Sequence, residues 1–275
     1  MTTPVTTPDS GPAEAPVLLT TEGAVATVTL NRPGAMNGLD VATKVLLRDT
    51  LADLAANDDV RCVVLTGTGR AFCVGQDLKE HVQHQREGRD DLLGSTVAEH
   101  YNPTVTTLLE MPKPVVAAVN GVAAGAGASL AMACDLRLVA DTAGFNFAFA
   151  GVGLSCDTGS SLTLPRLVGH ARAAELLFMP RTVDAEESLA IGLANRVVPA
   201  GDLAGEAATL AARLAAGPTV ALASIKASLA YAATHELADV LAFEGRQMRR
   251  TGDTEDHAAA VASFLAKEKP TFTGR

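Results

Sequence analysis

The chain has 275 residues, with 22 Lys and Arg against 31 Asp and Glu, so its formal net charge is −9. Apolar residues make up 48% and charged residues 19%, which excludes a largely disordered protein, and this length is sufficient to bury a large core. The acidic balance, the 4% aromatic content and the absence of Trp argue against a nucleic-acid-binding protein, because such proteins need basic surfaces and stacking platforms.

The chain begins with a segment, residues 1–16, that is rich in Pro, Thr and Ser and has neither a basic region nor an apolar stretch. This composition indicates a flexible, solvated tail and not a signal peptide, and we expect a cytoplasmic protein. No two cysteines have Cys-x-x-Cys spacing and most lie in apolar runs, so free thiols are expected. The four are Cys62, Cys73, Cys134 and Cys156.

Residues 17–200 alternate between strand-like and helix-like patterns, which predicts an α/β core. Helices are expected at 77–86 and 97–110, and a third begins near residue 40. Asp40 is the expected N-cap of a helix whose apolar stripe is formed by Val41, Val45, Leu47, Leu51 and Leu54. Apolar runs of suitable length predict strands at 24–30, 62–66, 115–119, 136–140 and 145–152.

Residues 115–134 are the strongest candidate for a membrane span, because Asn120 and Ser129 are the only strongly polar side chains in this run of 20. Length alone fits a transmembrane helix. Three glycines interrupt the run, however, and this pattern favours a buried strand, a glycine turn and a buried helix. We therefore expect no association with a membrane.

Residues 201–275 contain Ala- and Leu-rich helical patterns and no convincing strand. Such a helical region is too short to form a second core of its own. We expect it to pack on the α/β core or on a neighbouring subunit.

The best-known catalytic motifs are absent, including G-x-G-x-x-G, G-x-x-x-x-G-K-[ST], H-E-x-x-H and G-x-S-x-G. His81 and His84 form one close histidine pair, but without a third ligand they indicate a solvated helix face and not a metal site. Two glycine-containing loops, at 66–79 and 120–127, each follow a strand and precede a helix. If they face each other, their backbone N–H groups form an oxyanion hole; alone, each is an ordinary strand-to-helix turn.

Several motifs resemble the enoyl-CoA hydratase/isomerase (crotonase) superfamily and follow its order across residues 17–270. They are NRP at 31–33, AFCVGQDLKE at 71–80, KPVVAAVNG at 113–121, ACD at 133–135, LPRLVG at 164–169 and AIGLANRV at 190–197. The resemblance implies an α/β fold in which ββα units spiral into two roughly perpendicular sheets. It also implies a C-terminal helical trimerisation region, a homotrimer or dimer of trimers, and an acyl-CoA thioester as ligand, with no metal and no cofactor besides that CoA.

The same resemblance assigns site residues. The backbone N–H groups of Gln76 and Ala126 match the family's oxyanion hole, and residues 76–79 match its acyl-CoA-contacting segment. Within that segment, Lys79 is either a partner for the CoA phosphates or a solvated lysine. The acyl-CoA contacts implied are Gln76, Asp77, Leu78, Lys79 and Ala126.

The two glutamates of the family's hydratases fall on Ser129 and Phe149 in this chain, so both carboxylates are missing. Weak or absent hydration is expected, with both side chains lining the acyl pocket instead. Asp157 matches the acidic residue of several isomerases in the family, including the phenylacetate-pathway branch. The alternative is that Asp157 only N-caps the following helix.

The expected function is therefore a Δ3,Δ2-type enoyl-CoA isomerase with Asp157 as its one acid–base group. Three alternatives stay open: hydratase-like chemistry, dehalogenase- or hydrolase-like chemistry with Asp157 as nucleophile, and an acyl-CoA-binding homologue without catalysis. The dehalogenases pair their aspartate with a tryptophan, and this chain has Phe149 at that position.

Overall fold

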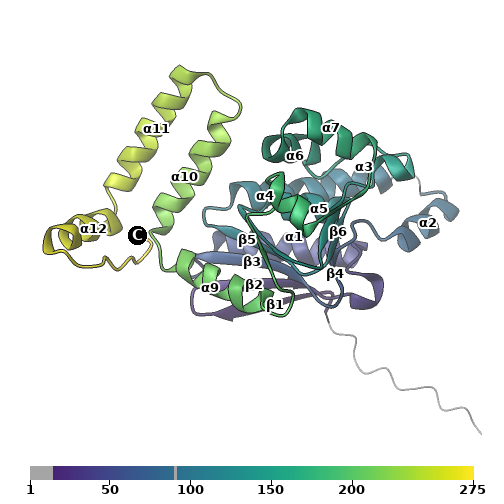
Figure 1. Cartoon of the computed structure of the whole chain (residues 1–275), viewed down its shortest axis with the longest axis horizontal. Coiled ribbons are helices and arrows are strands. Elements are labelled where there is room, and N and C mark those ends of the chain that lie inside the picture. Colours follow the sequence, from purple (N-terminus) through teal and green to yellow (C-terminus); the bar gives the residue numbers. More distant parts are fainter. Residues whose placement is uncertain (1–14, 90–91) are drawn as a thin grey trace, which may run out of the picture.

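The computed structural model of this protein describes residues 15–89 and 92–275 (Figure 1). Residues 1–14 of the predicted tail lie outside the described residues. Ten strands and twelve α-helices in this part of the chain form two sheets with covering helices and a group of helices at the C-terminal end. The predicted α/β class with two sheets is confirmed.

The larger sheet has the strand order β1-β2-β3-β5-β7-β10. β1 pairs antiparallel with β2, and the other neighbours are parallel. Its central strands are apolar and buried over residues 62–65 and 115–119, as expected for parallel strands covered on both faces. The strands are β1 (Val17–Glu22), β2 (Val25–Leu30), β3 (Cys62–Gly67), β5 (Val115–Val119), β7 (Leu136–Ala140) and β10 (Arg196–Val198).

The smaller sheet has the order β4-β6-β8-β9 and consists of three-residue strands. Its first three strands each follow a strand of the larger sheet directly, so that β3 leads to β4, β5 to β6 and β7 to β8. This repetition carries the chain from one sheet to the other at the loops that contain the candidate site. The strands are β4 (Ala71–Cys73), β6 (Val122–Ala124), β8 (Gly144–Asn146) and β9 (Thr182–Asp184).

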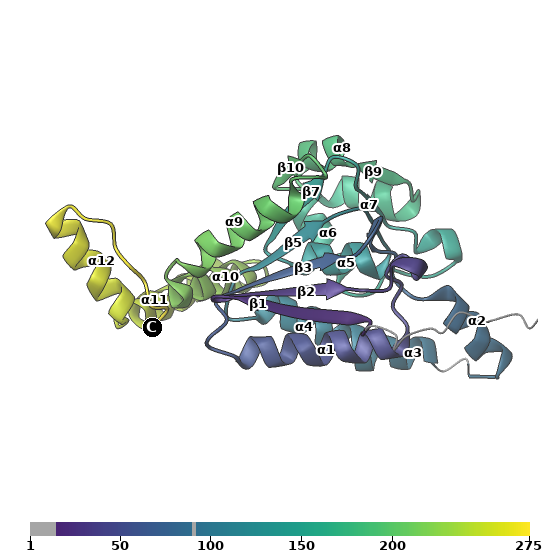
Figure 2. The same cartoon turned by 90° about the horizontal axis from the view of Figure 1, so that it is seen from below.

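Helices cover the larger sheet on both faces, with α1 and α4 on one face and α9 on the other (Figure 2). Short 3-10 helices lie at Pro33–Ala35 and Ala150–Val152, and a π-helical turn, η2, at Val97–Tyr101. The α-helices of the core are α1 (Val41–Ala56), α2 (Leu78–Arg86), α3 (Leu92–Thr96), α4 (Asn102–Glu110), α5 (Ala126–Ala133), α6 (Ser160–Val168), α7 (His170–Phe178) and α8 (Ala185–Ala190).

Helix α1 begins where the sequence predicts it, because the Asp40 carboxylate accepts a hydrogen bond from the Thr43 N–H at 2.8 Å. Its apolar stripe is partly wrong. Leu47, Leu51 and Leu54 are buried as expected, but Val41 is 38% exposed and Val45 only half-buried. Thr43 and Lys44 take the buried positions of the first turn instead.

The run 115–134 folds as the buried strand β5, a glycine turn with the short strand β6, and the buried helix α5, as predicted. In the described part of the chain no single helix has the length and hydropathy to cross a membrane. Two helices reach these limits only jointly, Leu203–Ala215 with Thr219–Ala232, and they are bent by 101°.

The strand predicted at 145–152 is wrong beyond Asn146. The alternating phenylalanines at 145, 147 and 149 imitate a strand, but Phe149 has helical backbone angles and a 3-10 turn follows, ending at Gly153 with φ +73°. Each of the three rings packs into the core, and among the described residues no strand pairs with the segment beyond Asn146.

The C-terminal region divides into two parts. Helix α9 (Leu203–Ala215) packs on the larger sheet and buries Leu203, Ala207, Ala211 and Ala215. Beyond it, helices α10 (Thr219–Ala232), α11 (Leu237–Gly252) and α12 (Glu255–Ala266) project away from the sheets (Figure 1). We call residues 219–266 the arm and the preceding α/β part, including α9, the body.

Candidate active site

The two glycine-containing loops meet. Gly75 has φ +81°, and a Cβ atom at this position would lie 2.9 Å from the Ala124 carbonyl oxygen and 3.1 Å from the Ala126 nitrogen. A Cβ atom at Gly127 would lie 2.1 Å from the Cys73 carbonyl oxygen. Both positions therefore need glycine, since any larger residue would separate the loop after β4 from the start of α5.

Gln76 and Ala126, whose backbone N–H groups are the predicted donors, both line one cavity at this contact. Ala126 is the first residue of α5, so its N–H has no acceptor within the helix. The hydrogen bonds found among residues 15–89 and 92–275 leave the Gln76 N–H unused as well. Two unengaged N–H groups from separate loops are the elements of an oxyanion hole.

The cavity at these donors has a volume of about 140 Å³ and a mainly apolar wall. An engineered 150 Å³ cavity in another protein accommodates benzene, so the space suits an apolar group of about six carbons. Among the described residues that line it, Asp157 is the only carboxylic acid. The apolar lining includes Val74, Leu78, Val97, Phe149, Val152 and Leu154, and the polar lining is Gln76, His81, Thr96, Tyr101 and Asp157.

Asp157 does not cap the helix that follows it. The N-cap of α6 is Gly159, and no side chain bonds to the first turn of that helix. The Asp157 carboxylate accepts a hydrogen bond from the Thr158 hydroxyl at 2.8 Å instead. Burial raises the pKa of Asp157 above its ordinary value, although the Thr158 hydroxyl opposes the rise. The capping alternative is wrong, and a half-buried carboxyl with a raised pKa faces an apolar cavity.

The backbone after Asp157 is strained. Thr158 has φ +52°, a left-handed conformation that a β-branched residue rarely adopts, and Gly159 follows with φ +76°. Such a conformation costs about 1–3 kcal/mol and persists only where the surroundings enforce it. Thr158 is 1% exposed, so packing holds the turn that follows Asp157.

The segment 76–79 reaches the cavity with only some of its side chains. Leu78 lines the cavity and is 55% exposed. The Asp77 carboxylate is engaged elsewhere, in an ion pair of 2.9 Å with Arg32 and a hydrogen bond from the Lys79 N–H. Burial disfavours ionisation of Asp77, but these hydrogen bonds and Arg32 hold its pKa below the ordinary value. Lys79 is exposed to solvent, a position open to a ligand phosphate.

The structure corrects the expectations for two neighbouring residues, Ser129 and His81. Phe149 lines the cavity as expected, but Ser129 does not: it is fully buried and hydrogen-bonded to the Gly125 carbonyl oxygen and the Ser160 hydroxyl. His81 is half-buried in the cavity wall and not on a solvated face. The residues that the structure describes include no group of three His, Cys, Asp or Glu side chains arranged for a metal ion.

One buried residue beside the site has no signal in the sequence. Lys44 is 2% exposed, and its ammonium group donates to the Gln76 side chain. A lysine in the first turn of a helix ordinarily indicates a solvated position, so only the three-dimensional contact identifies it.

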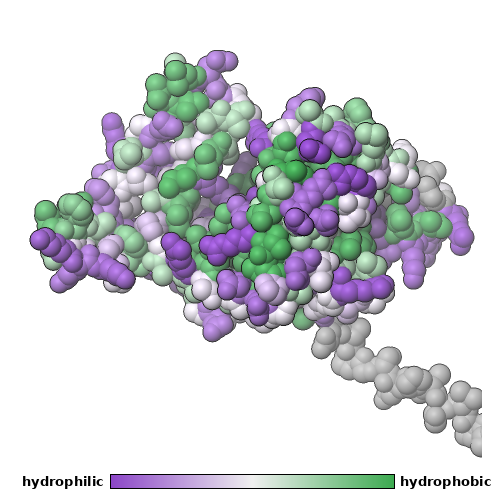
Figure 3. Space-filling model, in the orientation of Figure 1, coloured by the Kyte–Doolittle hydropathy of each residue, from purple (hydrophilic) through white to green (hydrophobic). Residues whose placement is uncertain are grey.

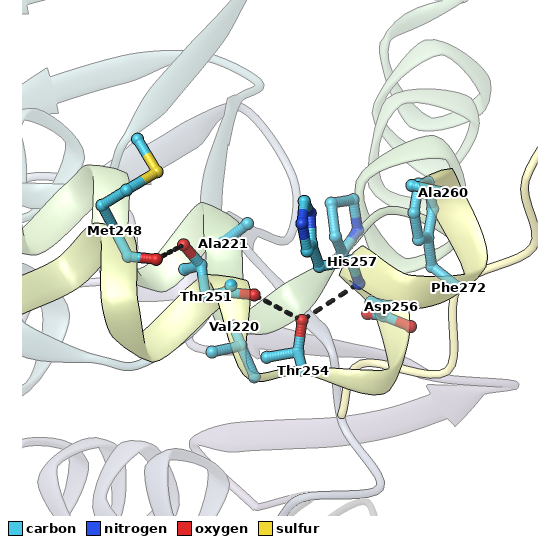
Figure 4. Close-up of a pocket in the computed structure, with 11 residues that line it drawn as sticks. Val220, Ala221, Met248, Thr251, Thr254, Asp256, His257, Ala260 and Phe272 are labelled. Atoms are coloured by element: carbon cyan, nitrogen blue, oxygen red, sulfur yellow. Dashed lines mark hydrogen bonds between the residues drawn. The ribbon is translucent and has the colours of Figure 1, made fainter. Parts of the chain in front are cut away.

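A larger cavity, of about 400 Å³, lies between α10, α11, α12 and the C-terminal segment (Figure 4). Thr254 there accepts from the His257 N–H and caps α12. Its buried carboxylate, Asp256, accepts hydrogen bonds from the backbone N–H groups of Thr273 and Gly274 and so fixes the C-terminal segment. The smaller cavity, in contrast, is lined by Gln76, Ala126 and Asp157, and the carboxyl group of Asp157 has a raised pKa.

Known proteins of the same fold carry mixed names. The 1,2-epoxyphenylacetyl-CoA isomerase of Escherichia coli K12 is 40% identical over 259 residues, which cover 94% of this chain and 98% of that protein. The short-chain-enoyl-CoA hydratase of Clostridium acetobutylicum is 35% identical over 256 residues, or 92% and 95%. A crystal structure of an enoyl-CoA hydratase/isomerase family protein from Mycobacterium abscessus matches with a TM-score of 0.90 at 42% identity, covering 94% of this chain and 100% of that one.

The family model for enoyl-CoA hydratase/isomerase matches residues 20–275, which is most of the chain. The match includes both loops of the cavity and Asp157. Full-length similarity at 40% identity and a TM-score of 0.90 agree with it. The chain therefore belongs to the enoyl-CoA hydratase/isomerase family.

Proposed function

We propose that this acyl-CoA enzyme is an enoyl-CoA isomerase of the Δ3,Δ2 type, with Asp157 as its single acid–base group. The observation that carries the proposal is that Asp157 is the only carboxylic acid among the described residues lining the cavity that Gln76 and Ala126 also line. A hydratase of this family needs two glutamates, and Ser129 and Phe149 stand in their places.

The proposed reaction moves one proton and one double bond. Asp157 removes a proton from C2 of a 3-enoyl-CoA, and the electron pair of the C–H bond forms an enolate whose negative charge lies on the thioester oxygen. The Gln76 and Ala126 N–H groups stabilise that charge. Asp157 then returns the proton to C4, which leaves the double bond between C2 and C3. No water is added, and the reaction uses no cofactor besides the CoA of the substrate.

The environment of Asp157 supports a role as base. A raised pKa makes a carboxylate a stronger proton acceptor, and general bases work best when their pKa approaches the working pH. Phe149 stands in place of a hydratase carboxylate, so the described wall of the cavity has no second carboxylate to activate a water.

A second substrate class is an aryl or epoxyaryl acyl-CoA. The isomerase relative named above acts, by its name, on 1,2-epoxyphenylacetyl-CoA. The cavity of about 140 Å³ matches the size of a six-membered ring. Rearrangement of such a substrate would again need the oxyanion donors and one carboxyl group.

We also propose a cytoplasmic homotrimer or dimer of trimers. The arm supports this because it exposes large apolar side chains, which Figure 3 shows on α10, α11 and α12, and contiguous patches of this kind mark interfaces. They include Ile225, Leu229, Leu237, Leu241, Phe264 and Leu265, which are 57–81% exposed.

The decisive experiment is the substitution Asp157→Asn. Asn is nearly isosteric, so acyl-CoA binding is expected to persist, while conversion of 3-enoyl- to 2-enoyl-CoA falls about 10²–10⁴-fold because the base is lost. Exchange of C2 hydrogen in heavy water is expected to fall in parallel. A wild type that binds the thioester but neither isomerises nor exchanges would point to a binding homologue, and hydration of crotonyl-CoA at ordinary enzyme rates would contradict the one-carboxylate mechanism.

A further inference from the structure

Lys44 is a buried cation whose shortest hydrogen bonds go to uncharged acceptors. Its Nζ atom donates to the Gln76 Oε1 atom at 3.0 Å and to the Thr96 hydroxyl at 2.7 Å, both uncharged acceptors. Its ion pair with Glu80 spans 4.0 Å. Burial of an ammonium group is costly unless its charge is compensated, and desolvation accordingly lowers the pKa of Lys44. The nearby carboxylates oppose this shift only in part.

The Gln76 side-chain oxygen, which accepts from Lys44, has a second donor. The Gln76 Oε1 atom also accepts a hydrogen bond of 2.7 Å from the Tyr101 hydroxyl. Lys44 comes from α1 and Tyr101 from η2, and both side chains are at most 3% exposed. The Gln76 side chain is therefore clamped by two buried donors from elements far apart in the sequence.

The backbone of the same residue is held on both sides. The Leu39 N–H donates to the Gly75 carbonyl oxygen at 2.8 Å, and the Asp77 N–H donates to the Leu39 carbonyl oxygen at 3.2 Å. These bonds flank the Gln76 peptide and leave its own N–H unused. Side-chain and backbone contacts together define the direction of that N–H, which is the feature that an oxyanion hole requires.

We propose that Lys44 is a positioning residue of the oxyanion hole, which fixes Gln76 through its side-chain amide and places a buried positive charge behind the developing enolate. This proposal rests on the proposed function for the enolate, but its geometric part concerns any bound thioester. A preorganised charge in a water-excluded site stabilises an oxyanion more than the same charge in water does.

The test compares Lys44→Met with the matched control Lys113→Met. Lys113 is also 2% exposed, but its ammonium group donates to the carbonyl oxygens of Leu54 and Asn57, away from the cavity. Both substitutions remove a buried ammonium group and both are expected to lower thermal stability. Only Lys44→Met is expected to lower kcat, by about 10–100-fold, with KM changed less than about threefold, because an indirect effect should stay below the 10²–10³-fold loss of a direct donor.

A spectroscopic measurement separates this inference from the isomerase proposal. The C=O stretching frequency of a bound 2-enoyl-CoA reports polarisation of the thioester and needs no turnover. We expect it to be lowered in wild type and Lys113→Met, and to return most of the way to the free value in Lys44→Met. A wild type without isomerase activity would refute the proposed function, while this frequency would still decide the role of Lys44.

Tyr101→Phe provides a second variant that keeps the charge and removes one of the two clamps. A loss of about two- to fivefold in kcat and a smaller change of the carbonyl frequency are expected, since one hydrogen bond of about 1 kcal/mol is lost. The inference is overturned if Lys44→Met matches Lys113→Met in kcat and carbonyl frequency, or if neither Lys44→Met nor Tyr101→Phe moves that frequency.

Discussion

The body and the arm use the same residue types in opposite ways. In the body, the central strands β3 and β5 are almost completely buried, and glycines bring backbones into contact at the cavity. In the arm, α11 has no buried residue at all, and a Cβ atom at Gly245 in this helix would meet nothing within 4 Å. The body has a continuous buried core beside scattered exposed residues such as Phe178 and Met179, whereas α11 and its neighbours in the arm expose apolar side chains and bury almost nothing.

The joint between the two regions is polar. Lys226 of α10 forms an ion pair of 2.9 Å with Asp135 and donates to the Leu108 carbonyl oxygen. The Arg61 guanidinium donates to the Thr219 hydroxyl and to the carbonyl oxygens of Gly217 and Phe272. The arm is thus held in a defined direction by charged groups, which leaves its apolar faces available for a second chain.

The largest effect is expected for Gly127→Ala. Its Cβ atom would lie 2.1 Å from the Cys73 carbonyl oxygen, so β4 and α5 must separate, at a cost of about 3 kcal/mol or more. Loss of acyl-CoA binding and a large fall in the melting temperature are expected. Gly245→Ala is the control in the arm, where Ala should stabilise the helix by up to about 1 kcal/mol. Equal melting temperatures for the two variants would remove the contrast between body and arm.

Assembly is the second test of the contrast. Leu229 and Leu237 are each 71% exposed, and Lys at both positions is expected to convert the proposed trimer to a monomer in sedimentation velocity. Each lost leucine contact would weaken association by about 1.5–3 kcal/mol, roughly 10–150-fold in the dissociation constant. Leu19→Lys on β1, where the leucine is 50% exposed, is the control. An assembled double variant would show that the arm is not the interface.

The smallest expected effect is the change in protein stability when one of two carboxylates, Asp157 or Asp256, is replaced by Asn. The folded pKa of Asp157 is raised by burial, so its protonated form stabilises the fold below the ordinary value of 3.8 and this stabilisation is lost as the pH rises through the folded pKa. Asn at position 157 does not ionise, so the Asp157→Asn variant keeps this stabilisation at pH 7. It is expected to have a higher melting temperature than wild type at pH 7 but not at pH 3.

Asp256→Asn in the arm should behave in the opposite way. It gives up one acceptor for the Thr273 and Gly274 N–H groups and is expected to lose about 1–2 kcal/mol at pH 7. The same carboxylate change would then stabilise the body and destabilise the arm. Urea unfolding curves at both pH values measure this, and a lower melting temperature for Asp157→Asn at pH 7 would contradict a desolvated carboxyl group. For wild type, kcat/KM is expected to fall on the acid side with a midpoint above 3.8.

Features set by local chemistry could be predicted from the sequence. The strands at 115–119 and 136–140 and the Asp40 cap agree with the structure, because apolar runs and capping side chains act within a few residues. The strand prediction for 145–152 is wrong beyond Asn146, because alternating phenylalanines have the period of a strand whether or not another strand pairs with them.

The candidate site depended on contacts that no local pattern contains. The resemblance located Gln76, Ala126 and Asp157, but only the close approach of Gly75 to Ala124 and Ala126 shows that the loops meet. Ser129 was misplaced because a side chain on a buried helix faces either the cavity or the core, and hydrogen bonds to Ser160 and Gly125 draw it into the core. The role of Lys44 could not be predicted, because its hydrogen-bond partners lie 32 and 52 residues away in the sequence.

All four cysteines lie in the body, so thiol labelling can measure how often the body opens and does not report on the arm. All four thiols are free and lie before residue 157, and burial raises the pKa of Cys62, Cys73 and Cys134 to about 12. An alkylating reagent in solution reaches these three sulfur atoms only when the sheets open, whereas Cys156 is half-buried. The labelling rate of Cys62, Cys73 and Cys134 therefore measures the rate at which the body opens. It does not change when helices beyond α9 fray.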